Sequence, residues 1–260
     1  MDLGITNKRA IVCAASKGLG KACAMSLARN GVDLVINSRT ASDLEATAAE
    51  IRAATGRAVT AVAADITTAE GRARVLAACP APDILVNNAG GPPREDFRKW
   101  NEDDWMKAVN ANMITPIMLI KAVVDGMIAR KFGRIVNVTS SVVKAPLPDH
   151  GLSQGPRAGL TAFAAGLARQ VARHNVTING LLPGPHRTDR VFSGAIEAAR
   201  RTNRTPEDIL AERSKNNPSG RLGDPFEFGE ACAFLCAASS GFIVGQNLLL
   251  DGGAFNSTLG

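Results

Sequence analysis

The sequence predicts an α/β fold, a single-domain Rossmann-type arrangement in which a doubly wound, seven-stranded parallel sheet carries helices on both faces. Short apolar runs of β-forming residues alternate along the chain with longer Ala-rich stretches of helical period, and this alternation is typical of parallel sheets. The runs are apolar almost throughout, as strands buried on both faces must be. No internal repeat or linker interrupts the order, so residues 1–260 are predicted to form one domain.

The expected elements follow directly from these runs. Strands are expected at 10–14, 32–37, 59–63, 84–86, 134–138, 176–182 and 247–250. Helices are expected near 18–30, 41–54, 68–79, 102–131, 153–174 and 225–238. The one irregular stretch, 185–220, is polar and follows the sixth strand at the carboxyl edge of the sheet, where α/β folds bind ligands. This stretch is therefore expected to form a substrate lid.

Composition excludes several classes of protein. With 45% hydrophobic and 21% charged residues the chain can build a sizeable core, which excludes bulk disorder. The net charge of +6 is not gathered into basic runs interleaved with aromatics, so no nucleic-acid partner is expected. No apolar run approaches the roughly 18 residues of a membrane helix, so no membrane partner is expected either.

The cysteines and the N-terminus bear on location. The five cysteines are scattered among apolar residues without Cys-x-x-Cys spacing, so free buried thiols are expected and no metal site. Free thiols are typical of a reducing compartment, and the first residues lack the basic-then-apolar pattern of a secretory signal. The expected location is the cytoplasm.

A glycine-containing turn follows the first expected strand, at residues 13–20 (CAASKGLG). Gly18 and Gly20 let the backbone turn tightly and bring a helix N-terminus against a pyrophosphate. Sites for NAD usually place an acidic residue at the end of the second strand, and that acid is missing here. Lys17 and Arg39 can instead converge on a 2′-phosphate, which favours NADP(H). The alternative is that both are solvated surface cations.

From this turn onward the chain resembles the short-chain dehydrogenase/reductase family, especially its 3-oxoacyl-(acyl carrier protein) reductase-like branch. In the family's opening motif, Thr-Gly-x-x-x-Gly-x-Gly, the first two places are held here by Cys13 and Ala14. Further matches follow in family order: Asp65, Asn87-Asn88-Ala89-Gly90, Gly133–Val138, Pro183-Gly184 with Thr188, Gly220–Pro225, Gly245-Gln246 and Asp251-Gly252-Gly253. The resemblance also implies a homotetramer, built through the helices near 102–131 and 153–174 and the last strand.

The turn and the resemblance together place the expected cofactor contacts in a few loops. These are Ala14, Ser16, Lys17, Gly18, Leu19 and Gly20; Ser38 and Arg39; Asp65 and Ile66; Asn88, Ala89 and Gly90; and Arg157, Pro183, Gly184, His186 and Thr188. The resemblance implies that Asp65 contacts adenine and that the loop from Pro183 to Thr188 holds the nicotinamide carboxamide.

The family's catalytic residues are Asn, Ser, Tyr and Lys, and this chain keeps part of that set. Asn112 and Ser140 stand at the Asn and Ser positions, with Asn110 as a nearby rival, while Ser153 and Arg157 stand at the Tyr and Lys positions. The chain contains no tyrosine. In the family the Tyr protonates the alkoxide, and a serine hydroxyl is a far weaker acid. Arg157 keeps the positive charge and could bind ribose hydroxyls, but it should not relay a proton.

A substitute proton donor is therefore needed if the chain is active. His150, in the loop that the family folds over its substrate, and His186, beside the expected nicotinamide, could each donate a proton near neutral pH. For both, the alternative is an ordinary loop histidine, and His174 is expected to be structural. Water held by Ser140 and Asn112 is a further candidate.

These residues predict an NADP(H)-dependent oxidoreductase with non-standard proton delivery, a carbonyl reductase or alcohol dehydrogenase and a candidate 3-oxoacyl thioester reductase. Its partner is expected to be a small-molecule or carrier-linked carbonyl compound, and a small surplus of basic residues between 187 and 215 hints at an acidic one. The alternative is an NADP(H)-binding family member without dehydrogenase activity, serving as a sensor or an oligomer partner.

Overall fold

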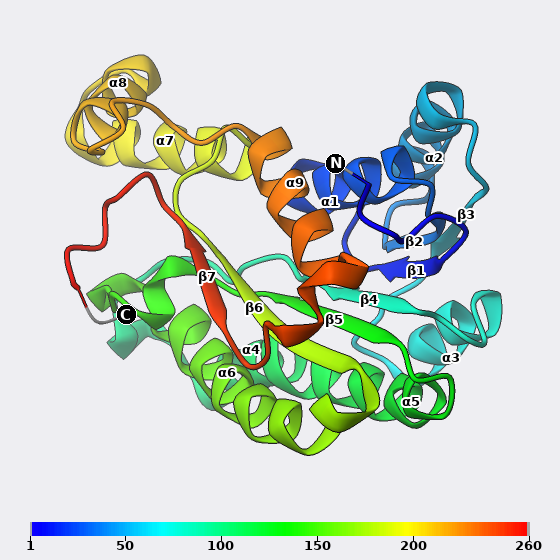
Figure 1. The fold of residues 1–260 in the computed structure, drawn as a ribbon. Helices are drawn as coiled ribbons and strands as arrows, with labels where there is room; N and C mark the ends of the chain where they lie inside the picture. The colour runs from blue at the N-terminus through cyan, green and yellow to red at the C-terminus, as the bar shows by residue number, and fades with distance from the viewer. Residues whose placement is uncertain (1, 259–260) are drawn as a thin grey trace.

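Seven parallel strands in the order β3-β2-β1-β4-β5-β6-β7 form the centre of the computed structural model, which describes residues 2–258 (Figure 1). The strand order reverses between β1 and β4, so the sheet is doubly wound and the predicted fold class is confirmed. The strands are β1 (Arg9–Val12), β2 (Asp33–Ser38), β3 (Val59–Ala63), β4 (Ile84–Asn87), β5 (Gly133–Val138), β6 (Val176–Pro183) and β7 (Asn247–Leu250).

Helices cover both faces of this sheet (Figure 1). Helices α1, α2 and α9 pack on one face around residues such as Leu27 and Phe228, and α3, α5 and α6 pack on the other around Leu119 and Ile120. The helices are α1 (Gly18–Arg29), α2 (Ala41–Thr55), α3 (Ala69–Ala78), α4 (Glu102–Val109), α5 (Thr115–Ala129), α6 (Gly151–Val171), α7 (Asp189–Thr202), α8 (Pro206–Lys215) and α9 (Pro225–Cys236). Burial of these apolar faces supplies the main force that holds the layers together.

Three segments differ from the expected elements. The long helix expected at 102–131 consists of α4 and α5 joined by a π-helical turn at Asn110–Ile114. Helix α6 begins at Gly151 rather than near 153, and Pro156 lies inside the helix. The stretch 185–220, which reads as irregular because its apolar positions are few, contains α7 and α8.

The composite helix Glu102–Ala129 is long and apolar enough to cross a membrane by length and composition, with a mean hydropathy of 1.4 in its best window. This measure averages over polar and charged residues such as Asn112, Lys121 and Asp125, so it is met although no uninterrupted apolar run of that length is present in the sequence. Asn112 and Thr115 within it are buried, and α5 packs on the sheet. These contacts are those of a core helix in a soluble protein.

Arg134, in β5, is a fully buried cation on the side of the sheet opposite the carboxyl edge. Its Nε donates to the carbonyl oxygen of Ala237 at 3.0 Å, and Nη1 donates to Gly133 and Asn175 at 2.9 Å each. Nη2 donates to Asn175 Oδ1 at 3.1 Å and to Ala238 at 3.2 Å. One guanidinium thus joins β5, the turn before β6 and the end of α9, and burial lowers its pKa.

Candidate active site

The loops that leave β1, β2, β3, β4 and β5 meet at the carboxyl edge of the sheet, around the point where the strand order reverses. Most of the residues expected to bind the cofactor or to act in catalysis lie on these loops. Ligands of open α/β sheets bind in the crevice at this edge.

The turn after β1 is shaped by backbone geometry. Ala14 has a φ of +47° and Gly18 a φ of +57°, both in the left-handed region. A Cβ at Gly20 would overlap the carbonyl oxygen of Ala14 and come within 2.7 Å of Asn88 Nδ2. Because Asn88 Nδ2 also donates to that carbonyl oxygen at 3.3 Å, the turn, α1 and the end of β4 are locked together.

Ala14 occupies a conformation that favours glycine, and the family motif has glycine at this place. We therefore expect Ala14→Gly to raise the free energy of unfolding by about 0.5–1 kcal/mol, because relief of left-handed strain exceeds the added entropy of the unfolded chain. Urea unfolding of the cofactor-free protein measures this. The control Ala15→Gly, at a buried neighbour without positive φ, should destabilise. A loss of stability in Ala14→Gly would contradict the assignment of strain.

Two cations border the expected position of a 2′-phosphate. Lys17 immediately precedes α1 and Arg39 follows β2, and both are exposed. Within residues 2–258 no carboxylate lies within 4 Å of either, whereas the nearby Lys21 pairs with Glu50 at 2.6 Å. Unpaired cations beside a glycine turn suit an added phosphate.

Asp65 follows β3, next to these cations. Its Oδ1 accepts from the amide of Thr67 at 2.9 Å and from the Thr67 hydroxyl at 2.7 Å. The two hydrogen bonds, and more weakly the charge of Arg39, lower the pKa of Asp65 against the opposing effect of burial. Asp65 is therefore a fixed, exposed carboxylate whose second oxygen faces no protein donor among residues 2–258.

Arg157, on α6, lies among the candidate catalytic residues at the carboxyl edge of the sheet. The residue is buried, and its Nε and Nη2 both donate to Asn112 Oδ1, at 3.1 and 2.9 Å. Nη1 donates to the carbonyl oxygen of Thr139, and Nη2 also donates to that of Ala89 at 3.4 Å. Burial, reinforced by the charge of Arg190, lowers the pKa of Arg157 to about 10. The guanidinium remains charged at neutral pH and joins the ends of β4 and β5 to the π-helical turn.

The π-helical turn separates the two asparagine candidates. Asn112 is buried against Arg157, and its Nδ2 donates to the carbonyl oxygen of Ala108 at 3.1 Å. Asn110 instead donates to the carbonyl oxygen of Thr67 at 3.3 Å, away from Arg157. The structure therefore places Asn112, and not Asn110, among the candidate catalytic residues. Such π-helical turns are frequent at functional sites.

The two serines contribute hydroxyl groups at the same edge. Ser140, just after β5, accepts from the amide of Val142 at 3.4 Å, which leaves its hydroxyl hydrogen to be donated. Ser153 lies in the first turn of α6, one helical turn before Arg157. Within residues 2–258 neither serine hydroxyl donates a hydrogen bond to a protein acceptor, so both can bind a small molecule or water.

His150 is buried at the start of α6, and its Nδ1 lies 2.6 Å from Asp149 Oδ1. Burial and the charges of Arg94 and Arg190 lower the pKa of His150, while Asp149 raises it. Nε2 has no protein partner within residues 2–258 and is not sealed from solvent. The carboxylate therefore orients the ring and leaves Nε2 able to exchange a proton.

His186 has a different setting. Its Nδ1 lies 3.0 Å from the carbonyl oxygen of Gly184, and its ring packs edge-on against Phe228 at 5.3 Å between centroids. A Cβ at Gly223 would come within 2.7 Å of the ring, and burial lowers the pKa of His186. The ring of His186 therefore packs between Gly223 and Phe228, which indicates a structural role.

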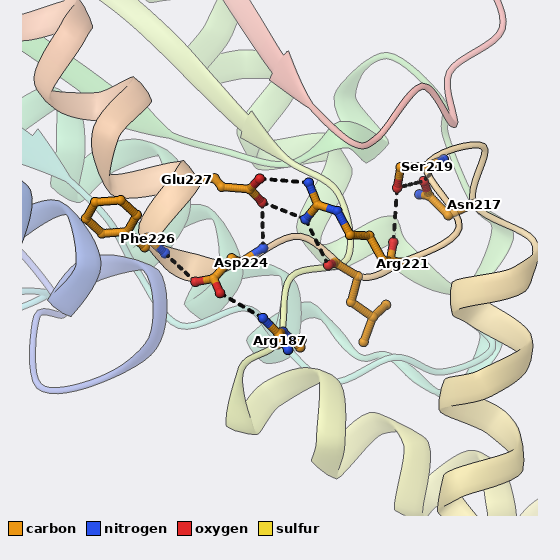
Figure 2. A network of polar contacts seen from close by, with 8 residues as sticks. Arg187, Asn217, Ser219, Arg221, Asp224, Phe226 and Glu227 are labelled. Carbon is orange, nitrogen blue, oxygen red and sulfur yellow. Dashed lines mark hydrogen bonds and ion pairs between the residues drawn. The ribbon is translucent and has the colours of Figure 1, made fainter.

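The loop after β6 is tied to α9 by a polar network (Figure 2). Arg187 donates to Asp224 Oδ2 at 2.7 Å, and Asp224 Oδ1 accepts from the amide of Phe226 at 2.9 Å. Arg221 makes two bonds to the carboxylate of Glu227, at 2.8 and 2.7 Å, which with the amide of Asp224 lower the pKa of Glu227 to about 2. The network fixes the end of the loop that runs from Pro183 through Gly184 to Thr188.

The remaining expected cofactor residues line the same edge. The side chains of Ser16, Leu19, Ser38 and Ile66 are partly exposed there, and Gly90 is exposed with no atom within 4 Å of an ideal Cβ. A groove of about 460 Å³ runs from Ser16–Gly18 to Arg187–Asp189. The close approach at Gly20, the open backbone at Gly90 and the unpaired cations fit NADP(H), which Lys17 and Arg39 would hold by its 2′-phosphate.

Sequence reasoning missed three participants in this site. Asp149 orients His150, the carbonyl oxygen of Thr139 accepts from Arg157, and Arg190 reaches the loop after β4. The Asp-His pair was readable as adjacent residues. The other two contacts depend on how loops fold over one another, for which the sequence carries no local signal.

Comparison with known proteins gives relatives of matching length. A family model described as Enoyl-(Acyl carrier protein) reductase matches residues 13–254. The chain is 31% identical to the 3-oxoacyl-[acyl-carrier-protein] reductase FabG of Vibrio harveyi over 97% of this chain and 99% of that protein. It is 31% identical to gluconate 5-dehydrogenase of Gluconobacter oxydans, over 96% and 95% respectively. The structure is similar to L-sorbose reductase from Gluconobacter frateurii complexed with NADPH and L-sorbose, with a TM-score of 0.93, 28% identity and coverage of 99% and 100%.

Proposed function

The chain belongs to the short-chain dehydrogenase/reductase family, and from that premise we propose that it is an NADP(H)-dependent oxidoreductase that interconverts a carbonyl group and an alcohol. The observation that carries this proposal is the arrangement of Asn112, Ser140 and a buried cation around one edge beside a glycine turn. Relatives described with NADPH, such as L-sorbose reductase, support the choice of cofactor.

NADPH, when bound, supplies the hydride that reduces the carbonyl carbon. Ser140 donates its hydroxyl hydrogen to the carbonyl oxygen and so polarises the double bond. As the C=O π bond breaks, His150 transfers the proton on Nε2 to the oxygen, and Asp149 stabilises the ring at Nδ1. Arg157 places a positive charge beside the oxygen and holds Asn112 in position. His150 then regains a proton from solvent, and every step reverses for alcohol oxidation.

We propose that Ser153 supports this route by holding water and does not act as the acid itself. Its hydroxyl has a pKa far above that of an imidazolium. The buried position of Ser153 in the first turn of α6, three residues after His150, supports a bridging water between the two. His186 supports the loop beside the nicotinamide through its contact with Gly184.

Residues 185–220 remain our proposed substrate lid within a single domain of residues 1–260. Helices α7 and α8 stand beside the carboxyl edge of the sheet (Figure 1), and Arg190 at the start of α7 bonds to Gly91 and Pro92 of the opposite loop. Phe192 and Ile196 on α7 are 44% and 43% exposed, which suits a helix that closes on a substrate. A lid deletion that leaves activity intact would contradict this role.

Assembly and location are proposed from weaker support. The exposed apolar side chains of Met106, Ile114 and Phe163 lie on α4, the π-helical turn and α6, the region that the family uses for a homotetramer. A monomer mass in light scattering would contradict this assembly. The five buried free thiols support a cytoplasmic location, which fractionation of the native cells would test.

The function is tested by NADPH oxidation with ketones, aldehydes and 3-oxoacyl thioesters. We expect the wild type to turn over at least one of these compounds, and we expect the rate to fall in Ser140→Ala. NADPH binding without turnover on the whole panel would favour the non-enzymatic alternative, a sensor or an oligomer partner.

Arg39→Gln tests the cofactor preference. Loss of a charge-assisted bond to the 2′-phosphate is expected to raise the dissociation constant for NADPH about 10–100-fold, from roughly 1.5–3 kcal/mol. The constant for NADH should stay within about threefold, since NADH lacks that phosphate. Fluorescence titration measures both constants. The control Arg74→Gln, an exposed cation on α3, should leave both constants unchanged, and an equal loss for NADPH and NADH in Arg39→Gln would contradict the assignment.

A further inference from the structure

Two guanidinium groups meet on the loop that follows β4. Arg157 Nη2 donates to the carbonyl oxygen of Ala89 at 3.4 Å, and Arg190 donates to those of Gly91 at 2.8 Å and Pro92 at 3.0 Å. Because residues 89 and 91 are two positions apart, the carbonyl groups of Ala89 and Gly91 lie no more than about 7 Å apart. Two cations from α6 and α7 are thus held close together at the loop after β4. We call the region between this loop and the start of α7 the mouth of the site.

Arg94 belongs to the same loop and brings a third cation to this mouth. The amide of its neighbour Glu95 donates to the carbonyl oxygen of Asp149 at 3.3 Å, which places the loop against His150. After burial, the charge of Arg94 is the next cause that lowers the pKa of both His150 and Arg190. The charge of Arg94 therefore acts on both of these residues.

Arg213 lies behind this group, on α8. It donates to the carbonyl oxygens of Val191 and Gly194 at 3.3 Å each, and burial followed by the charge of Arg94 lowers its pKa. The lid therefore adds positive charge to the mouth from its own side.

The opposing carboxylates are few. Asp149 is engaged with His150, and Glu197, which acts on Arg190, lies 3.7 Å from Arg201. Within residues 2–258 no carboxylate lies within 4 Å of Arg94, Arg157, Arg190 or Arg213. Like charges held together without counter-ions destabilise a site, and an anion brought by a ligand offsets that repulsion.

Resting on the proposed function, we propose that the carbonyl substrate carries a small oxyanion, a carboxylate or a phosphate, and that Arg94 and Arg190 bind this group while the carbonyl meets Ser140 and His150. Arg190 binds on the lid side and Arg94 on the loop side, so the anion joins the two walls of the mouth. Arg190 and the buried Arg157 bond to the same short loop, and this close spacing favours one small anionic group over the broad acidic surface of a carrier protein.

Matched substrates test the inference. The pairs are acetoacetate with methyl acetoacetate, and dihydroxyacetone phosphate with dihydroxyacetone, so that each pair differs in the anion and the two pairs distinguish carboxylate from phosphate. In the wild type we expect kcat/KM to favour the anionic member of one pair at least about tenfold, equivalent to about 1.4 kcal/mol. Added salt should reduce this preference.

Arg94→Gln is expected to lower that preference about five- to tenfold, through a rise in KM for the anionic member. Within residues 2–258 the side chain of Arg94 makes no hydrogen bond, so this variant should fold normally, and far-UV circular dichroism checks it. The matched control is Arg98→Gln, an exposed cation four residues further along that bonds to Asp96, lies over the Phe97 ring and should keep the preference. Arg190→Lys keeps the charge and should retain part of the preference.

Thermal stabilisation of the NADP⁺-loaded protein by the same compounds gives a readout that does not need turnover. Stabilisation by an anionic member that is lost in Arg94→Gln supports the inference. If the anionic and neutral members of each pair give equal kcat/KM values, or stabilise the protein equally, the anion site is contradicted while the proposed function stands. Anion-dependent stabilisation without turnover of any pair contradicts the proposed function alone, and the absence of both effects contradicts both.

Discussion

His150→Gln is expected to lower kcat for carbonyl reduction about 10²–10³-fold, within the range that positioned acid–base groups contribute. The glutamine side chain keeps a hydrogen-bonding group near Asp149 but cannot deliver a proton. The dissociation constant for NADPH should stay unchanged, because His150 lies on the α6 side of the edge and not in the glycine turn. Steady-state kinetics measure the first quantity and fluorescence titration the second.

The pH profile adds a readout that a structural role would not change. The groups that face His150 are Asp149, Arg94 and Arg190, and burial with the two arginines lowers its pKa below the usual value of 6.5. Reduction needs the protonated ring, so kcat for reduction should fall as pH rises through this lowered pKa, while kcat for alcohol oxidation should rise to a plateau. In His150→Gln, kcat for reduction and kcat for oxidation should both lose this dependence on pH.

Two further variants complete this test. Asp149→Asn should reduce kcat less than His150→Gln does, since the ring is retained but its orienting charge is lost. His174→Gln, beyond the far end of α6 where His174 Nε2 accepts from Arg173 Nε at 3.1 Å, is the control and should leave kcat unchanged. An unchanged kcat in His150→Gln would refute the histidine route and favour water held by Ser140 and Asn112.

Arg134→Met is expected to lower the free energy of unfolding by about 3–5 kcal/mol, the range for breaking a buried polar network. Methionine fills part of the volume, but it removes the guanidinium donor from the carbonyl groups of Gly133, Asn175, Ala237 and Ala238, of which Asn175 and Ala237 keep backbone donors in Gly133 and Ser240. Each hydrogen bond to a charged donor that is lost costs about 1.5–3 kcal/mol, and the remaining donors and water entering the space recover part of that sum. The midpoint of urea unfolding measures the change.

Arg98→Met is the matched control for Arg134→Met. Arg98 has a side chain that is 73% exposed and pairs only with Asp96, so its replacement should change stability by no more than about 0.5 kcal/mol. Equal effects in the two variants would contradict the structural role of Arg134. Because Arg134 lies at the opposite end of β5 from Thr139, the stable fraction of Arg134→Met should retain its NADPH affinity.

The sheet could be predicted from sequence because its signal is local and repeated. Each strand is an apolar run, and both-face burial makes these runs stand out from the polar helix surfaces. The helices of the lid were not predicted because polar and charged residues dominate both segments, which bury only a few residues such as Ala195 and Ile209. In α7 the apolar residues Val191, Ala195 and Ala199 nevertheless recur every four residues, and this helical period was readable in the sequence.

The parts of the candidate site that could be predicted are those formed by residues close together in the sequence. The glycine turn and the cations beside it follow from the conformations that phosphate binding requires. The roles of Asn110 and Asn112 could not be separated, because an extra residue in the π-helical turn changes which side chain faces inward. The cations of the mouth could not be grouped either, since Arg94, Arg157 and Arg190 are brought together only by three separate loops and helices.

The bonds made by Arg157 carry an evolutionary consequence. A lysine at position 157 carries its three N–H donors on one nitrogen, whereas the guanidinium spreads its donors over Asn112, Thr139 and Ala89. A tyrosine at position 153 without that lysine would lack the neighbouring ammonium that makes the phenol acidic in the family. We therefore expect the two positions to be epistatic: the gain from a tyrosine at 153 depends on a lysine at 157, and that lysine gives up the contacts that the guanidinium makes.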